Sequence, residues 1–458
     1  MNSWEQRERA RQILAKEVGY VTKPHGDRLR VALAFPNTYW VGMSNLGFQT
    51  VYRLFNAEPD IVCERFFLPP KQELAALSAA KTPLLTLESQ TPVGEFDVVA
   101  FSVSFEWDYV NVLTLLRLAG IPAYASERTG RHPLVVIGGA VTFVNPEPLA
   151  PVRAFPAERI LQLAEQARRY SQRAGLVSIA LCDHPEIERI LSRLLELGYA
   201  ISPASLRLDD LTPAIVQMLR QSGERSITIA PETGSDRLRR VINKTVTNDE
   251  ILDSAELIFA NGIESLKLYY MIGLPTETDE DLVAIRDLTL QLRERMLKHA
   301  KPRGRVGSIT GSVNPLIPKP GTAYQWLAME DPSATDRKIK RLRSLMAGID
   351  NVYFNIKSER HSYYQALLSL GDRRVAPAVA AAERNGQNWR AAVAEAGIDG
   401  DFYIFRDRTK DAMLPWDIID GGMKRPFFEA ELAKSLRAEW TLPPKRAQEN
   451  AKLLPVIP

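Results

Sequence analysis

Cysteine is scarce in this sequence of 458 residues, which contains only Cys63 and Cys182. Neither belongs to a group of cysteines and histidines at metal-ligand spacing, so each is predicted to be an ordinary buried thiol. The five histidines are equally scattered and form no HExxH pattern. Because GxxxxGK[ST] and GxGxxG patterns are also missing, the common phosphate-binding loops are excluded.

Long apolar stretches and a strong net charge are lacking as well. No stretch approaches the roughly 20 apolar residues that span a bilayer, and residues 1–16 are polar and charged. We therefore expect a cytoplasmic protein without membrane contact. The 58 basic and 55 acidic residues leave a net charge of +3, which gives no clear signal for nucleic acid. Charge does not distinguish a small-molecule from a macromolecular substrate.

The N-terminal third is predicted to form an open α/β domain over residues 20–148, preceded by a helix in residues 1–19. Three short, mainly apolar runs are typical of buried parallel strands. They comprise residues 28–35, 98–105 and 134–137. Ligands of such sheets bind at the carboxyl ends of the strands. This expected ligand edge comprises residues 37–45, 102–104 and 138–142.

Residues 149–330 alternate between strand and helix patterns, which predicts a parallel barrel or sheet with functional groups on the loops after the strands. Five strands are expected, at residues 176–181, 200–206, 226–230, 265–272 and 306–313. A capping box formed by Thr247 and Glu250 marks one helix start. Residues 331–440 are predicted to form a smaller α+β region, and residues 441–458 a tail.

One loop that could carry chemistry spans residues 230–238 and reads APETGSDRL. Glu232 ends a predicted strand, and Ser235 opens the following helix. A carboxylate at this place can accept hydrogen bonds from ribose hydroxyls. Both residues also suit an ordinary helix start, so this alternative stands beside the functional interpretation.

A second loop spans residues 270–278 and reads YMIGLPTET. Gly273 offers bare backbone groups, and Ile272 and Leu274 offer an apolar wall that could receive adenine. The alternative is a plain strand-to-helix turn with Thr278 as the helix N-cap.

Together the two loops resemble the fourth- and fifth-strand motifs of radical S-adenosylmethionine (SAM) enzymes, in which ESGS-like and GLPxET-like elements bind the nucleotide. Residues 314–322 (NPLIPKPGT) with Gln325 and Trp326 resemble the sixth-strand signature of the subgroup with an N-terminal cobalamin (B12)-binding-type domain. Residues 138–148, 371–375 and 414–420 are similar to further parts of that subgroup. The resemblance covers most of the chain.

This resemblance implies a flavodoxin-like open sheet, then a (β/α)6 partial barrel that cleaves SAM reductively with a [4Fe-4S] cluster. Two departures stand out. The DxHxxG element by which many such domains ligate cobalt is absent, because Asn45-Leu-Gly47 occupies that turn, which argues against cobalamin. The CxxxCxxC motif is also missing, because residues 146–150 run almost directly into residues 151–156, which resemble the segment after the cysteine loop.

The sequence therefore predicts a truncated barrel of the radical SAM family that lacks the cluster ligands and is inactive as written. Either the chain is an incomplete version of an active enzyme, or it is a degenerate relative that binds a nucleotide or a protein without redox chemistry. No residue is assigned to catalysis or to a metal. The resemblance suggests cofactor contacts from Glu232, Ser235, Ile272, Gly273, Leu274, Asp183 and Arg207. The edge of the strand at residues 176–181 is expected to be exposed and to favour self-association.

Overall fold

The computed structural model describes residues 3–139, 155–176, 181–203, 206, 211–419 and 422–441. Its contacts divide the chain into two units, and each unit is described by itself. Unit 1 consists of Met1–Pro146, Tyr364–Ile404 and Met413–Gly421, and unit 2 of Glu147–Tyr363, Phe405–Ala412 and Gly422–Pro458. The chain thus returns to unit 1 twice, and the segment predicted as a separate region, residues 331–440, is shared between both units.

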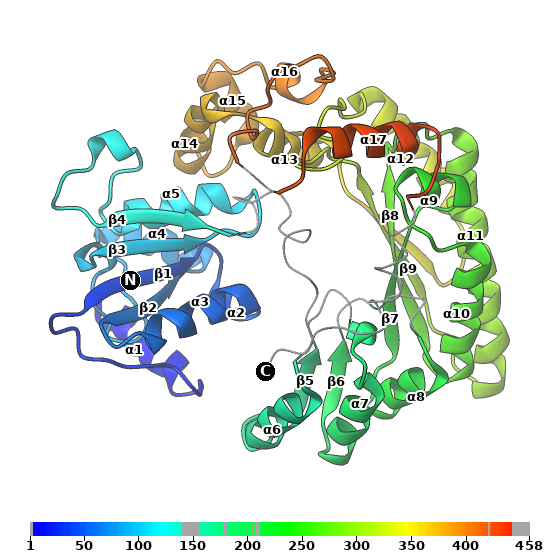
Figure 1. Cartoon of the computed structure of the whole chain (residues 1–458), viewed down its shortest axis with the longest axis horizontal. Coiled ribbons are helices and arrows are strands. Elements are labelled where there is room, and N and C mark those ends of the chain that lie inside the picture. The colour runs from blue at the N-terminus through cyan, green and yellow to red at the C-terminus, as the bar shows by residue number, and fades with distance from the viewer. Residues whose placement is uncertain are drawn as a thin grey trace. The chain divides into compact units, whose positions relative to one another are not determined.

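Unit 1 contains a four-stranded parallel sheet in the order β2-β1-β3-β4 (Figure 1). The strands are β1 (Leu29–Phe35), β2 (Ile61–Phe67), β3 (Val98–Ser102) and β4 (Leu134–Gly138). The helices of its N-terminal part are α1 (Ser3–Leu14), α2 (Tyr39–Met43), α3 (Leu46–Ala57), α4 (Lys71–Ala80) and α5 (Asp108–Leu118). On one face of the sheet, Val31, Leu33 and Phe35 of β1 share a core cluster with side chains of α1 and α3. On the other face, Ala32 and Ala34 of β1 share a second cluster with side chains of α4 and α5. Burial on both faces explains why residues 31–35 of β1 are continuously apolar.

Strand β2 was not predicted, because its centre carries two charged residues, Glu64 and Arg65. Both are buried, and partners from other segments neutralise them. The Nε atom of Arg65 lies 2.7 Å from Oε1 of Glu88, and its Nη1 atom lies 2.5 Å from Oε1 of Glu17. Buried charges are tolerated only with such pairing.

The C-terminal contribution to unit 1 is helical. It includes α14 (Ala376–Arg384), α15 (Trp389–Glu395) and α16 (Gly400–Ile404), and α13 (Glu359–Leu370) leads into it. Ala381, Ala382, Trp389 and Ala392 form one buried cluster with Val110 of α5. The small alanine side chains allow these helices to approach α5 closely.

Unit 2 contains a four-stranded parallel sheet in the order β10-β9-β8-β7 and a two-stranded parallel sheet, β5-β6. The strands are β5 (Arg173–Leu176), β6 (Ala200–Pro203), β7 (Ser226–Glu232), β8 (Ser265–Ile272), β9 (Ile309–Pro315) and β10 (Val352–Ile356). The helices are α6 (Ala157–Ala167), α7 (Ile187–Glu196), α8 (Pro213–Gln221), α9 (Asp236–Val241), α10 (Asn248–Ala260), α11 (Asp279–Ala300), α12 (Pro332–Met346) and α17 (Arg425–Leu436).

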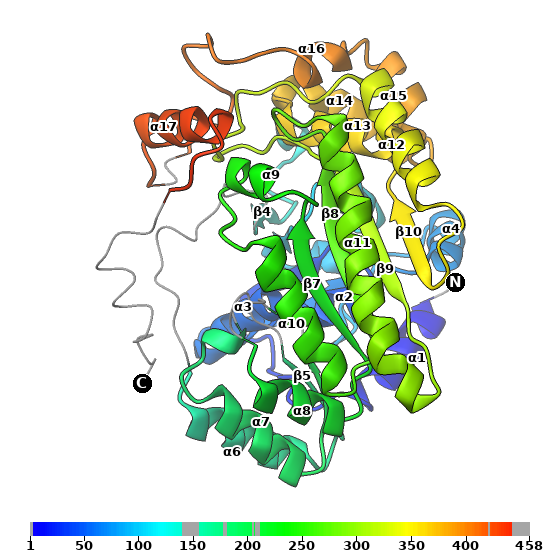
Figure 2. The same ribbon diagram turned by 90° about the vertical axis from the view of Figure 1, so that its right-hand side faces the viewer.

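Helices α10 and α11 run across one face of the larger sheet (Figure 2). Strand β8 shows why this face forms the core, because Leu266, Leu268, Tyr270 and Ile272 are all buried at alternate positions. The opposite face of β8 carries Lys267, Tyr269 and Met271, which are exposed or half-buried. The period of two along the strand fixes which residues point away from the helices.

The prediction of an α/β fold with parallel sheets is confirmed. Several boundaries were wrong. Strand β5 ends at Leu176, where the first strand of this region was predicted to begin, and residues 177–180 lie outside the described part. Strand β7 continues to Glu232, and β10 is a sixth strand that was not predicted. In the described ranges, no helix combines the length and apolar character needed to cross a membrane.

Candidate functional site

Glu232 lies at the carboxyl end of β7 in an unusual backbone conformation. Its φ angle is +64°, in the left-handed region that residues other than glycine and asparagine rarely adopt. The parallel pairing of β7 with β8 shifts in register between Ile229 and Glu232, so the end of β7 departs from regular strand geometry just before this residue.

Lys244, in the loop that follows α9, holds the Glu232 carboxylate. Its Nζ atom donates a hydrogen bond to Oε1 of Glu232 at 3.1 Å and another to the carbonyl oxygen of Ala230. The Glu232 side chain is 26% exposed and that of Lys244 is 32% exposed. The pair is therefore partly accessible, and both groups keep further hydrogen-bonding capacity for a ligand.

Ser235 serves as the N-cap of α9. Its hydroxyl accepts a hydrogen bond from the backbone N–H of Leu238 at 3.2 Å and donates one to Asp281 of α11 at 2.6 Å. The helix-start interpretation of Ser235 thus matches the geometry, and the predicted ligand contact stays a prediction. The preceding Gly234 lies against α11, where a Cβ atom would come within 2.1 Å of the Ile285 nitrogen.

The predicted adenine wall lies inside the protein. Ile272 is fully buried on the helix-facing side of β8, and Leu274 is buried against Leu238 and Val241 of α9. The backbone N–H of Gly273 donates a hydrogen bond to Oε2 of Glu277 at 2.7 Å. These residues shape the loop from within, and the half-buried Met271 is the neighbour that reaches its surface.

A cavity of about 240 Å³ lies beside these loops, at the carboxyl ends of β8 and β9. Its apolar lining comes from Val241, Ile242, Met271, Leu316 and Ala323. Its polar lining comes from Asn243, Thr322, Tyr324, Glu431, Lys434, Ser435 and Glu439. The hydroxyl of Tyr324 bridges the carbonyl oxygen of Val241 and the hydroxyl of Ser435, at 2.8 Å each, and so joins α9 to α17.

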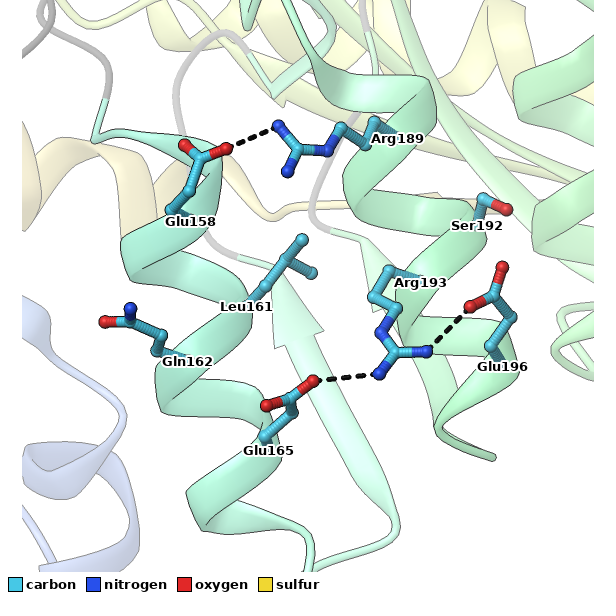
Figure 3. Close-up of a pocket in the computed structure, with 8 residues that line it drawn as sticks. All are labelled: Glu158, Leu161, Gln162, Glu165, Arg189, Ser192, Arg193 and Glu196. Atoms are coloured by element: carbon cyan, nitrogen blue, oxygen red, sulfur yellow. Dashed lines mark hydrogen bonds and ion pairs between the residues drawn. The ribbon is translucent and has the colours of Figure 1, made fainter.

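A larger hollow, of about 430 Å³, lies between α6 and α7 (Figure 3). Ion pairs fill it: Glu158 lies 2.6 Å from Arg189, and Glu165 lies 2.9 Å from Arg193. Figure 3 shows that these pairs tie the two helices to one another. Since the charged groups neutralise each other, this hollow offers no convergent set of groups for a ligand.

The expected ligand edge of unit 1 is rich in hydrogen bonds between its own side chains. After β1, the amide of Asn37 donates to Asp108 at 3.2 Å, and after β3 Ser104 accepts from Asn45 at 3.3 Å. Burial raises the pKa of Asp108 despite the donation from Asn37 and Asn111. Residues 140–142, the last part of this predicted edge, lie outside the described residues.

Two weaker candidates cannot be placed in the site. Arg207 lies outside the described residues. Asp183 belongs to a short 3-10 helix, Leu181–Asp183, and its side chain also lies outside the described part. Both stay predictions.

Three charged residues of the site, Lys244, Glu277 and Asp281, were missed. Asp281 accepts hydrogen bonds from Ser235, Thr278 and Arg237, which outweigh the effect of burial and keep its pKa below the ordinary value. Its position three residues after the Thr278 N-cap is a capping-box signal that could have identified it. No local pattern indicated Lys244.

Two family models match the chain. "Radical SAM proteins, N-terminal" matches residues 47–155, and "Radical SAM superfamily" matches residues 144–289. The second range contains β7, β8 and the loops that follow both strands. These matches support membership of the radical SAM superfamily.

The chain is 31% identical over 229 residues to the uncharacterized protein MJ0966 of Methanocaldococcus jannaschii. The match covers 49% of this chain and 48% of the relative, so it spans about half the length of that protein.

Two solved structures are distantly similar. Streptococcus suis SuiB bound to S-adenosylmethionine has a TM-score of 0.32 and 14% identity, over 45% of this chain and 44% of that protein. Escherichia coli coproporphyrinogen III oxidase (HemN), a radical SAM enzyme, has a TM-score of 0.26 and 8% identity, over 73% and 55%. TM-scores this low support no inference about function from these two structures.

Proposed function

We propose that unit 2 binds S-adenosylmethionine at the carboxyl edge of β7, β8 and β9, and that this chain does not carry out the radical step. The observation that carries the binding proposal is the Glu232–Lys244 pair at the same edge as the 240 Å³ cavity. Strained backbone conformations such as that of Glu232 concentrate at functional sites.

Each group of the ligand has a suitable counterpart at this edge. The ribose hydroxyls would donate to the Glu232 carboxylate, as in other parallel α/β sites. The methionine carboxylate would accept from the Lys244 ammonium, which is a strong charge-assisted donor. Adenine would occupy the cavity, between Met271 and Leu316, with the polar groups around it as hydrogen-bonding partners.

The cysteines do not fit an iron-sulfur cluster. Such clusters are held by cysteine thiolates, and the family takes three of them from one loop. This chain has only Cys63, in β2 of unit 1, and Cys182, in unit 2. Burial raises the pKa of the Cys63 thiol, which disfavours the thiolate. In the part of the chain that the structure describes, no three Cys, His, Asp or Glu side chains are grouped as metal ligands. No radical chemistry is therefore assigned.

The resemblance to radical SAM enzymes also suggests how the sheets of the two units are related to that family's fold. We propose that the five strands β5 to β9 derive from a (β/α)6 barrel whose first strand and cysteine loop are missing, that β10 is an additional strand beside β9, and that unit 1 is built on a flavodoxin-like domain. The all-parallel order β2-β1-β3-β4 supports the second assignment. The turn Asn45-Leu-Gly47 offers no histidine, so we propose no cobalamin site. The missing strand would leave the edge of β5 open for self-association.

Isothermal titration calorimetry with S-adenosylmethionine tests the binding proposal. We expect saturable heat with the wild type and about tenfold or weaker binding for Glu232→Gln, because a hydrogen bond to a charged group contributes about 1.5–3 kcal/mol. Glu294→Gln is the matched control, since Glu294 is exposed on α11. Absence of saturable heat in the wild type would instead favour the alternative, a protein-interaction relative.

Anaerobic reconstitution with iron and sulfide tests the second half of the proposal. We expect no absorbance band of a [4Fe-4S] centre after desalting. A band that persists on the column would show that this chain holds a cluster and would restore the enzyme interpretation.

A further inference from the structure

Three charged side chains meet beneath the turn that follows β8. The Nζ atom of Lys338, on α12, lies 2.6 Å from Oε2 of Glu277 and 2.5 Å from Oε1 of Glu330. The same Oε2 atom of Glu277 accepts the backbone N–H of Gly273 at 2.7 Å. One carboxylate oxygen therefore connects the turn to a helix that lies 61 residues further along the chain.

The turn depends on this connection because its own backbone is not relaxed. Gly273 has a φ angle of +77°, and Thr276, which has a side chain, has a φ angle of +64°. Left-handed residues other than glycine persist only where surrounding contacts enforce them. Arg237 supplies one such contact, donating to the Thr276 hydroxyl at 2.9 Å and to its carbonyl oxygen at 2.8 Å. Glu277 supplies the other.

Glu277 is costly to bury, and Lys338 offsets that cost. Its side chain is 1% exposed, and its Oε1 atom has no hydrogen-bond partner among the described residues. Burial raises the pKa of Glu277, although Lys338 and the Gly273 amide counteract this. Loss of the ammonium would leave a buried carboxylate without its counter-charge, which proteins avoid by moving or protonating the group.

The turn also forms part of the wall behind the cavity. Leu274 contacts Leu238 and Val241 in one buried cluster, and Met271 packs against the same cluster. Val241 and Met271 both line the 240 Å³ cavity. A displacement of the Gly273 turn would therefore change the shape of the cavity without any change to the residues that would touch adenine.

We infer that Lys338 is a positioning residue for the adenosyl ligand, acting through Glu277 on the Gly273 turn. This inference rests on the proposed binding of S-adenosylmethionine to unit 2. Lys338 belongs to α12 and to neither of the two loop motifs, and no contact between Lys338 and the ligand is required.

Calorimetry and hydrogen exchange together test the inference on Lys338→Met, Lys338→Arg and Lys340→Met. For Lys338→Met we expect at least tenfold weaker binding of S-adenosylmethionine and at least tenfold faster exchange of the Gly273 amide. Lys338→Arg should restore most of the affinity for S-adenosylmethionine and most of the protection of the Gly273 amide, because a guanidinium can still reach the Glu277 carboxylate. Lys340→Met is the matched control, because Lys340 is exposed on the same helix and pairs with Asp336 rather than with Glu277. It should stay within about twofold of wild type in both measurements.

The two measurements separate the possible failures. If the wild type does not bind S-adenosylmethionine, the proposed function fails, but exchange still shows whether Lys338 holds the turn. Faster exchange with unchanged affinity in Lys338→Met would overturn the positioning role, and so would unchanged exchange. Should Lys338→Met not fold, the Lys338→Met/Glu277→Gln variant removes both charges and should exchange faster at Gly273 than Lys340→Met does.

Discussion

Replacing Gly234 with alanine tests the close contact between the loop after β7 and helix α11. A Cβ atom at this position would lie 2.1 Å from the backbone nitrogen of Ile285 and 2.3 Å from the carbonyl carbon of Ala284. Non-bonded atoms are most favourable at about 3.5–4.0 Å, so the loop and the helix would have to separate by about 1 Å or more. No side chain can rotate away to relieve the clash, because both neighbours are backbone atoms.

The magnitude follows from the rigidity of those neighbours. Extra methyl groups in a well-packed interior cost about 1–3 kcal/mol, and we expect about 3 kcal/mol here because a helix backbone must move. For a domain of this size, 1 kcal/mol shifts Tm by about 2–4 °C, so the transition of unit 2 should fall by about 6–12 °C. Differential scanning calorimetry measures this shift.

Gly175→Ala is the matched control in the same unit. Gly175 lies in β5 without a left-handed φ angle, and a Cβ atom there would meet no atom within 4 Å. Its Tm should change by about 2 °C at most, because alanine replaces glycine in a strand without strain. Equal Tm values for the two variants would refute the close contact.

The remaining predictions concern two buried ionisable groups and one sheet edge. Burial raises the pKa of Asp281, but hydrogen bonds from neighbouring hydroxyl, amide and guanidinium groups outweigh it and lower that pKa. Its stabilising contribution is therefore present above the ordinary aspartate pKa of about 4 and is lost as the pH falls below it. In a pH series the Tm difference between wild type and Asp281→Asn should shrink toward about pH 3, and a constant difference would count against this. Arg65→Met leaves Glu88 buried without its ion pair, so urea unfolding of unit 1 should show a loss of about 3–5 kcal/mol. Arg65→Met/Glu88→Leu should recover much of it; strictly additive losses would contradict the pairing. Finally, sedimentation velocity should show concentration-dependent self-association that Gly175→Pro weakens, because proline removes a backbone donor from β5; a wild-type monomer at every concentration would rule this out.

Elements with local signals could be predicted from the sequence. The capping box of Thr247 and Glu250 begins α10, and α11 begins directly after the N-cap Thr278, as expected. Both signals lie within a few residues of the feature they mark, so no distant partner is needed. The same is true of the apolar runs of β1 and β8.

Elements that depend on distant partners could not be predicted. Glu64 and Arg65 interrupt the apolar pattern of β2, and only His25, Glu88 and other segments of unit 1 make their burial acceptable. Lys338 and Glu277 are a similar case, because their sequence separation has no periodic signature. Ionic partners of this kind are fixed by the tertiary fold alone.

The candidate site was predicted in outline but not in orientation. The motif at residues 270–278 indicated a loop that lies beside the 240 Å³ cavity. Ile272 nevertheless faces the helices, because Leu266, Leu268 and Tyr270 occupy the same side of β8. Counting alternate residues along the strand would have identified Met271 as the accessible neighbour. Because Tyr270, Met271 and Ile272 are all apolar or aromatic, the sequence alone did not show which of them is buried and which is accessible.

The interleaved path of the chain has a consequence for its synthesis. The Val110 side of α5 is covered by Ala381, Trp389 and Ala392, which the ribosome adds long after the rest of that sheet has emerged. A nascent chain stalled near residue 350 would therefore present an uncovered apolar surface to chaperones. Unit 1 can therefore be completed only after residues 364–404 have been translated.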